Sequence, residues 1–246
     1  MTRKQALARY DPIRAGMRRV LRLAPKACGK ADFTRALKQI LPGAEGAPDD
    51  AQVFEMLVDI ALFEPNQRGR RAYDGFLHKG AAALDPPDRA LAEAMAGARF
   101  SLFRAAGRHQ AAGIWAEDLL TGGARLWLMD RGLEASAPEG LAFGLRLFDA
   151  GPFHAGFGIV VPVDADTLGF AQAAAARGAP LPFRHSLAAT LYGDALRKRF
   201  PSPGDAALLE VLEALFERAA EAKQAKPPGP AAGQAAPPPA PSRRRK

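Results

Sequence analysis

Cysteine is almost absent from this chain, since Cys28 is the only one among its 246 residues. A single thiol cannot form an internal disulfide, and disulfides are typical of secreted proteins and oxidising compartments. We therefore expect a cytoplasmic protein.

Long apolar runs are absent as well. No stretch approaches the ~20 consecutive apolar residues that a membrane-spanning helix needs. The basic N-terminal segment is not followed by an uninterrupted apolar stretch, because Arg and Lys recur through Lys38. We therefore expect neither a secretion signal nor contact with a membrane.

Signatures of enzymes and of metal sites are scarce. The segment from Gly75 to Gly80 lacks the Gly-Lys-Ser/Thr ending of a phosphate-binding loop, which disfavours nucleotide hydrolysis. The histidines are far apart in sequence, and none forms a helical pair suited to binding a metal; they are His78, His109, His154 and His185. We expect no metal and no cofactor, we assign no catalytic residue, and we lean against an enzyme.

Basic residues are present in excess, but only at the two ends of the chain. Residues 1–47 carry 11 Lys and Arg against 3 Asp and Glu, and residues 223–246 carry 6 against none. The segment between them has 17 basic and 23 acidic residues, so the formal net charge of +8 arises entirely at the ends. Basic ends on a mildly acidic body are typical of arms that bind a polyanion or an acidic partner.

The first basic end has a helical pattern. Asp11 before Pro12 predicts an N-cap and a first-turn proline, and apolar residues at helical spacing extend the predicted helix to Leu23. Its other side carries arginines at steps of four with one more adjacent, so their guanidinium groups form a row. Arginine suits phosphate because its planar fork donates two parallel hydrogen bonds. The candidate polyanion contacts are Arg14, Arg18, Arg19 and Arg22, together with Arg243, Arg244, Arg245 and Lys246 at the other end.

The partner of these residues would be nucleic acid, bound without sequence preference, or an acidic protein. A solvated helix face and a GC-rich genome explain the same arginines without any partner, and the sequence does not indicate an oligomeric state.

The period of the hydrophobic pattern changes twice along the chain, and this predicts an α+β fold. We expect a helical region over 1–98, a small antiparallel five-stranded barrel-like sheet over 99–163, helices over 164–222 that pack on both, and a disordered Pro/Ala-rich basic tail over 223–246. The Thr121-Gly122-Gly123 step predicts a hairpin turn, because glycine adopts positive φ readily. The predicted helices of the first region are 12–23, 32–41, 51–63, 69–78 and 88–96. The predicted strands are 99–104, 114–120, 125–129, 141–148 and 153–163.

Acidic residues offer a rival hypothesis. Glu117 and Asp118 are adjacent carboxylates at a strand end, and with Asp130 and Asp149 they suggest a metal-dependent hydrolase. Adjacent strand residues point to opposite faces, however, so Asp118 is expected instead to bond the amides of the following turn.

Four motifs resemble a module of uncharacterised bacterial proteins. They are Arg99-Phe-Ser-Leu-Phe-Arg104, Glu117-Asp-Leu-Leu-Thr-Gly122, Leu128-Met-Asp-Arg-Gly-Leu133 and Gly140-Leu-Ala-Phe-Gly-Leu-Arg-Leu147. Some proteins of that group carry a SecA-type zinc knuckle, which this chain cannot form with one cysteine. The resemblance implies a β module and a bacterial origin, and it implies no activity.

We therefore expect a non-catalytic binding or adaptor protein whose basic ends contact nucleic acid or an acidic protein. The alternatives are the hydrolase and a structural subunit whose tail keeps it soluble.

Overall fold

The computed structural model describes residues 1–42, 50–178 and 186–199. Every described residue belongs to one compact unit, Met1–Phe200. The helix expected after residue 205 and the basic tail lie outside the described residues. Among the residues that are described, no helix is both long and apolar enough to cross a membrane.

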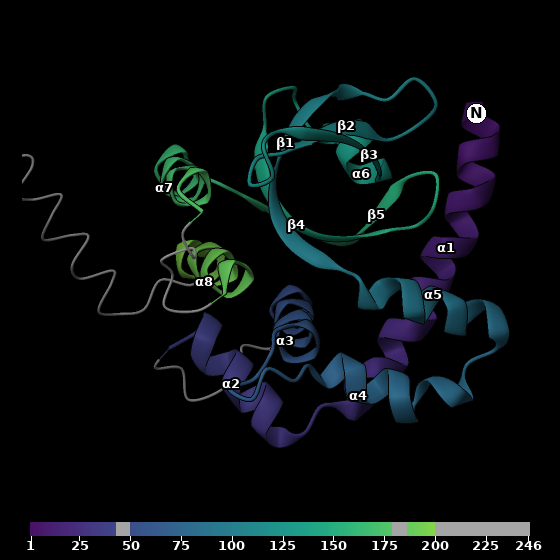
Figure 1. The fold of residues 1–246 in the computed structure, drawn as a ribbon, viewed down its shortest axis with the longest axis vertical. Helices are drawn as coiled ribbons and strands as arrows, with labels where there is room; N and C mark the ends of the chain where they lie inside the picture. Colours follow the sequence, from purple (N-terminus) through teal and green to yellow (C-terminus); the bar gives the residue numbers. More distant parts are fainter. Residues whose placement is uncertain (43–49, 179–185, 200–246) are drawn as a thin grey trace, which may run out of the picture. The chain divides into compact units, whose positions relative to one another are not determined.

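Helices form the first part of this unit, as predicted (Figure 1). One of them begins after a capping aspartate: the Asp50 carboxylate accepts hydrogen bonds from the amides of Gln52 and Val53, at 2.9 and 3.1 Å. The elements are α1 (Arg3–Leu23), the 3₁₀ turn η1 (Ala24–Ala27), α2 (Lys30–Ile40), α3 (Ala51–Phe63), α4 (Ala72–Lys79), the 3₁₀ turn η2 (Ala81–Ala83) and α5 (Pro86–Ala96).

The first helix begins nine residues earlier than predicted, which corrects the assignment of Asp11 as its N-cap. Thr2 is the N-cap, and it forms a reciprocal capping box with Gln5, so that Pro12 lies inside α1. Proline inside a helix loses one hydrogen bond and clashes with the preceding turn, at a cost of about 3 kcal/mol. Burial of Ala6 and Tyr10 against the barrel offsets this cost.

A closed five-stranded barrel follows, and with the helices it confirms the α+β prediction (Figure 1). The ring order is β1-β2-β3-β5-β4, in which β1 pairs with both β2 and β4. This order contains a Greek key and is the arrangement of OB-type barrels. The strands are β1 (Arg99–Arg108), β2 (Ile114–Asp118), β3 (Ala124–Met129), β4 (Ala142–Asp149) and β5 (His154–Pro162).

Two features of the barrel differ from the prediction. The pairing of β3 with β5 is parallel and covers Leu128–Met129 and His154–Ala155, whereas the other four pairs are antiparallel as expected. A short helix, α6 (Arg131–Ser136), stands between β3 and β4. It places Leu133 in the apolar cluster inside the barrel, beside Phe103 and Phe143.

Two more helices follow the barrel, α7 (Ala165–Ala176) and α8 (Leu187–Arg199). On α8, Leu191 and Tyr192 are buried in one apolar cluster with Ile60 of α3 and Leu102 of β1. Because α8 also contacts α2, it joins the N-terminal helices to the outer face of the barrel.

A buried histidine predicts that stability falls in mild acid. His109 is 9% exposed, accepts a hydrogen bond from the Ala111 amide at Nδ1 (3.1 Å), and stacks on Trp127 with 3.8 Å between ring centroids. Burial lowers the pKa of His109 below its ordinary 6.5. The unfolded chain therefore binds this proton more readily, so the stabilisation is present above pH 6.5 and is lost as the pH falls below it.

We expect the free energy of unfolding in urea to decrease between pH 7 and pH 5, and His109→Asn, which keeps an acceptor but does not titrate, to show a smaller decrease. An equal decrease in both proteins would contradict this role for His109.

A groove beside the first helix as the candidate functional site

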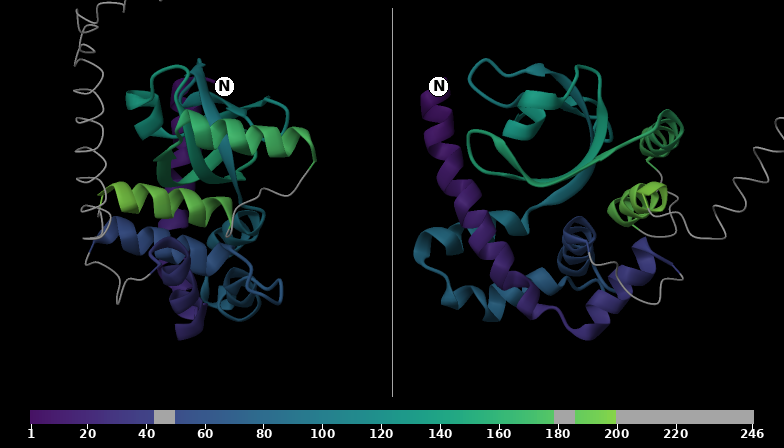
Figure 2. Two further views of the ribbon diagram at one scale, coloured as in Figure 1. Left: turned by 90° about the vertical axis from the view of Figure 1, so that its left-hand side faces the viewer. Right: turned by 180° about the vertical axis from the view of Figure 1, so that it is seen from behind.

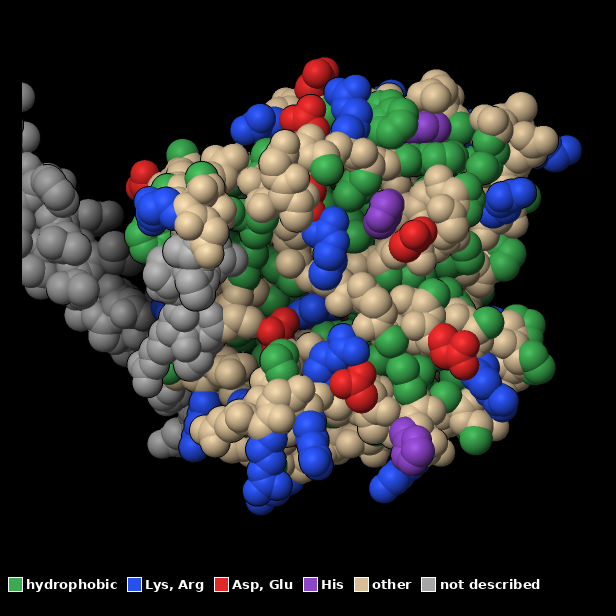
Figure 3. Space-filling model, viewed as in Figure 1, with side chains coloured by type: hydrophobic (Ala, Val, Ile, Leu, Met, Phe, Trp, Pro, Cys, Tyr) green, Lys and Arg blue, Asp and Glu red, His purple; other side chains and the backbone are tan. Residues whose placement is uncertain are grey.

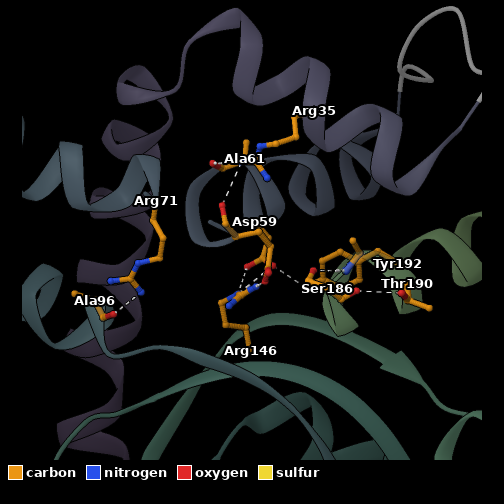
Figure 4. Close-up of polar contacts among 11 residues, drawn as sticks. Arg35, Asp59, Ala61, Arg71, Ala96, Arg146, Ser186, Thr190 and Tyr192 are labelled. Atoms are coloured by element: carbon orange, nitrogen blue, oxygen red, sulfur yellow. Dashed lines mark hydrogen bonds and ion pairs between the residues drawn. The ribbon is translucent and has the colours of Figure 1, made fainter. Parts of the chain in front are cut away.

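A buried ionic network joins α3 to the barrel and to α8. Arg146 of β4 donates from Nε to both carboxylate oxygens of Asp59, at 2.9 and 3.1 Å, and from Nη2 to Glu64 at 2.5 Å. The Tyr192 hydroxyl of α8 donates to Asp59 at 3.1 Å. Figure 4 shows Arg146 and Tyr192 converging on Asp59 from different elements. The side chains of Arg146 and Asp59 are only 4% and 2% exposed.

These groups hold one another in place. Burial alone would lower the pKa of Arg146, but the attraction of Asp59 and Glu64 outweighs it and raises the pKa, so the guanidinium stays charged. Burial raises the pKa of Asp59 against the opposing attraction of Arg146. Because each polar group is engaged, we interpret the network as a clamp that fixes α3 against β4, not as a free acid or base.

A groove of about 460 Å³ lies between α1, α3 and β5, next to this network. Figure 2, right, shows α1 as it passes the barrel, with α3 beneath the barrel. One wall carries Arg14, Arg18 and Arg22 of α1. Asp59 is also among the lining residues, so the clamp fixes one wall of the groove.

A second cavity, of about 700 Å³, adjoins the groove at α1 and β5. Its lining includes Arg14 and Arg18 again, together with Arg131 and Ser136 from α6. Strand β5 contributes to both spaces, with Phe157 and Ile159 in the first and Gly158 in the second. Arg14 and Arg18 thus line both spaces, whereas Arg22 lines only the first.

The predicted arginine row divides into two kinds of residue. Arg14 donates to the carbonyl oxygen of Gly156 at 3.3 Å and lies directly over the β5 backbone. Arg19 forms a paired interaction with Asp88 of α5, with 2.6 Å between Nη2 and Oδ1. Arg18 and Arg22 are exposed, and the side chain of neither has a hydrogen bond or an ion pair within the described part of the chain. Arg243, Arg244, Arg245 and Lys246 lie outside that part.

The two long walls of the groove differ in charge. Helix α3 contains no basic residue, and its charged side chains on the groove are Glu55 and Asp59. Phe54 of α3 is 58% exposed at the groove. On the face that Figure 3 shows, basic side chains lie both beside acidic ones and away from them.

The four carboxylates of the rival hypothesis do not come together. Asp118 is fully buried, where it is bound by Arg99, by the Ser101 hydroxyl at 2.8 Å and by the Leu120 amide at 3.1 Å. This confirms the expectation that Asp118 bonds an amide of the following turn. Asp130 caps α6 and Asp149 accepts from a turn amide, while Glu117 lies 3.9 and 3.8 Å from Arg104 and Arg125. Among the described residues, no group of three His, Cys, Asp or Glu could hold a metal.

The outer face of β2 and β3 carries a pair of tryptophans. Five-stranded barrels of this type can bind oligonucleotides on that face, through aromatic stacking. Here Trp127 stacks on His109, and the guanidinium of Arg125 lies 5.8 Å from the Trp115 ring. Because the protein's own groups already contact both rings, which are half-buried, this face is a weaker candidate than the groove.

Sequence reasoning found the basic wall of the groove but missed the other wall. The buried residues Val53, Met56, Leu57 and Ile60 define the inner face of α3, and Phe54 lies away from it. An aromatic residue on the outer side of a predicted helix is the signal that would have identified this wall.

Comparison with known proteins identifies a family. Residues 4–167 match a family model described as "Family of unknown function (DUF7986)". No curated protein and no solved structure matches the chain. The matched range includes every residue that lines the two cavities.

Proposed function

The chain belongs to the family of unknown function DUF7986, and we propose that it is a non-catalytic binding protein, a bacterial cytoplasmic adaptor whose basic ends contact a polyanionic partner. That partner is nucleic acid or an acidic protein. The contact on α1 is made by Arg18 and Arg22.

One observation supports this proposal above the others. Arg18 and Arg22 lie one helical turn apart beside a groove and have no partner among the described residues, whereas Arg14 and Arg19 on the same helix are engaged. Free guanidinium groups at a concave surface attract anions, and their fork geometry suits phosphate and carboxylate alike. The basic residues 243–246 would add to this attraction in a salt-sensitive manner.

Salt dependence tests the proposal. We expect the full chain to bind duplex DNA, RNA or polyglutamate with an affinity that falls as salt rises, because polyanion binding releases counterions. For a nucleic acid, Arg18→Gln with Arg22→Gln should reduce the slope of log affinity against log salt by about two, or about 0.9 per lost contact. Deletion of residues 223–246 should reduce it further. Fluorescence anisotropy at several salt concentrations measures both changes.

A matched control separates this site from net charge. Arg68 and Arg70 are exposed in the segment before α4 and do not line the groove, so Arg68→Gln with Arg70→Gln removes the same charge elsewhere. If this control weakened binding as much as the α1 pair, or if binding did not respond to salt, the proposal would be wrong.

A further inference from the structure

We propose that the groove between α1 and α3 is a docking site for one helix of a partner protein, with acidic side chains along one edge and an apolar face beside them. This inference rests on the proposed function and decides between its two classes of partner.

The spacing of the basic wall matches a helical partner. Residues four apart on an α-helix are separated by about 6 Å along the axis, so Arg14, Arg18 and Arg22 present positive charge at that repeat. A second helix laid alongside α1 repeats its own side chains at the same interval. Acidic residues at steps of four on that helix would therefore meet the row in register. From Arg14 to Pro25 the lining spans about 16 Å, which is three helical turns.

The groove also has an apolar component that a polyanion alone would not use. Leu21 of α1, Val58 of α3 and Phe157 of β5 are half-buried and line it. Phe54, at 58%, is the most exposed large hydrophobic side chain in the described part of the protein. Exposed apolar residues around a groove are typical of helix-in-groove recognition, in which an amphipathic helix buries its apolar face.

The difference in charge between the walls favours protein over nucleic acid. A nucleic-acid strand carries negative charge along its whole backbone, and in this groove its phosphates would meet Glu55 on the α3 side. An amphipathic helix can place carboxylates against α1 and neutral or basic residues against Glu55. Charge complementarity thus selects a partner whose acidic residues lie on one edge only.

Synthetic peptides test this inference on the full chain. One peptide of about four helical turns carries Glu at every fourth position beside a leucine stripe, and a second has the same composition in scrambled order. We expect the patterned peptide to bind at least about tenfold more tightly than the scrambled one, by fluorescence anisotropy. Phe54→Ser should weaken it about tenfold, since a central aromatic side chain often dominates such interfaces.

Phe170→Ser is the matched control, because Phe170 is 52% exposed on α7 and does not line the groove. Equal binding of the two peptides, or no effect of Phe54→Ser, would overturn the docking inference. An oligonucleotide that depends on Phe54 and displaces the patterned peptide would assign the groove to nucleic acid instead. If binding of polyglutamate and DNA still depends on Arg18 and Arg22 while Phe54→Ser does not change binding of the patterned peptide, the proposed function stands and only this inference fails.

Discussion

Replacing Arg146 with alanine is expected to lower the free energy of unfolding by about 3–5 kcal/mol. The substitution removes the cation that compensates two carboxylates, those of the buried Asp59 and of Glu64, both of which accept hydrogen bonds from Arg146. An uncompensated buried carboxylate must be desolvated without a partner, or must become protonated. Urea denaturation followed by circular dichroism measures the loss directly.

Two further variants distinguish a buried clamp from an ordinary ion pair. Arg131 and Asp11 form an exposed pair at 2.8 Å, with side chains 55% and 56% exposed, so Arg131→Ala should cost less than about 1 kcal/mol. Combining Arg146→Met with Asp59→Leu removes both buried charges, and should cost less than the sum of the two single substitutions. A loss below 1 kcal/mol in Arg146→Ala would show that the network does not hold α3 to the barrel.

The second large effect is expected at the turn between β1 and β2. Gly113 has φ of +76°, and a Cβ atom there would lie 2.3 Å from the backbone oxygen of Leu128. Backbone of a paired strand cannot rotate away as a side chain can, so Gly113→Ala forces β2 and β3 apart. We expect it to destabilise the protein by about 3 kcal/mol or more, combining overpacking with backbone strain.

Gly122 provides a matched control in the predicted hairpin turn, which the structure confirms. Its φ is +77°, and a Cβ atom there would meet nothing within 4 Å. Gly122→Ala therefore introduces only the strain of a positive φ, which we expect to lower the free energy of unfolding by about 1 kcal/mol. If the two alanine variants had equal unfolding free energies, the close approach of Gly113 to Leu128 would have no energetic importance.

Local signals explain where the sequence predicted the fold well. Helix α3 begins and ends where predicted, because Asp50 caps it and its apolar period is regular. The predicted start of α1 was wrong because Asp11-Pro12 is a strong local start signal. The true start depends on the burial of Ala6 and Tyr10 against residues of the barrel, which lie far along the chain. The parallel pairing of β3 with β5 has no local signature at all.

In the candidate site, too, local features could be predicted from the sequence and long-range contacts could not. The four-residue spacing of Arg14, Arg18 and Arg22 is visible in the sequence and places them on one groove wall. The pairing of Arg19 with Asp88 joins α1 to α5, so only tertiary structure shows that this arginine is already engaged. The opposite wall exists because Arg146 fixes Asp59 and α3 against β4, which spacing in the sequence cannot reveal.

A charge swap tests whether Arg18 and Arg22 contact the anionic groups of a partner. Dissociation constants are measured at one salt concentration for the wild-type chain and for Arg18→Glu with Arg22→Glu. Each protein is titrated with the patterned peptide and with the same peptide carrying Lys in place of Glu. We predict that the reversed protein loses the acidic peptide and gains the basic one, while Arg68→Glu with Arg70→Glu leaves the preference of the wild type unchanged. Undiminished binding of the acidic peptide by the reversed protein would show that Arg18 and Arg22 do not contact these groups.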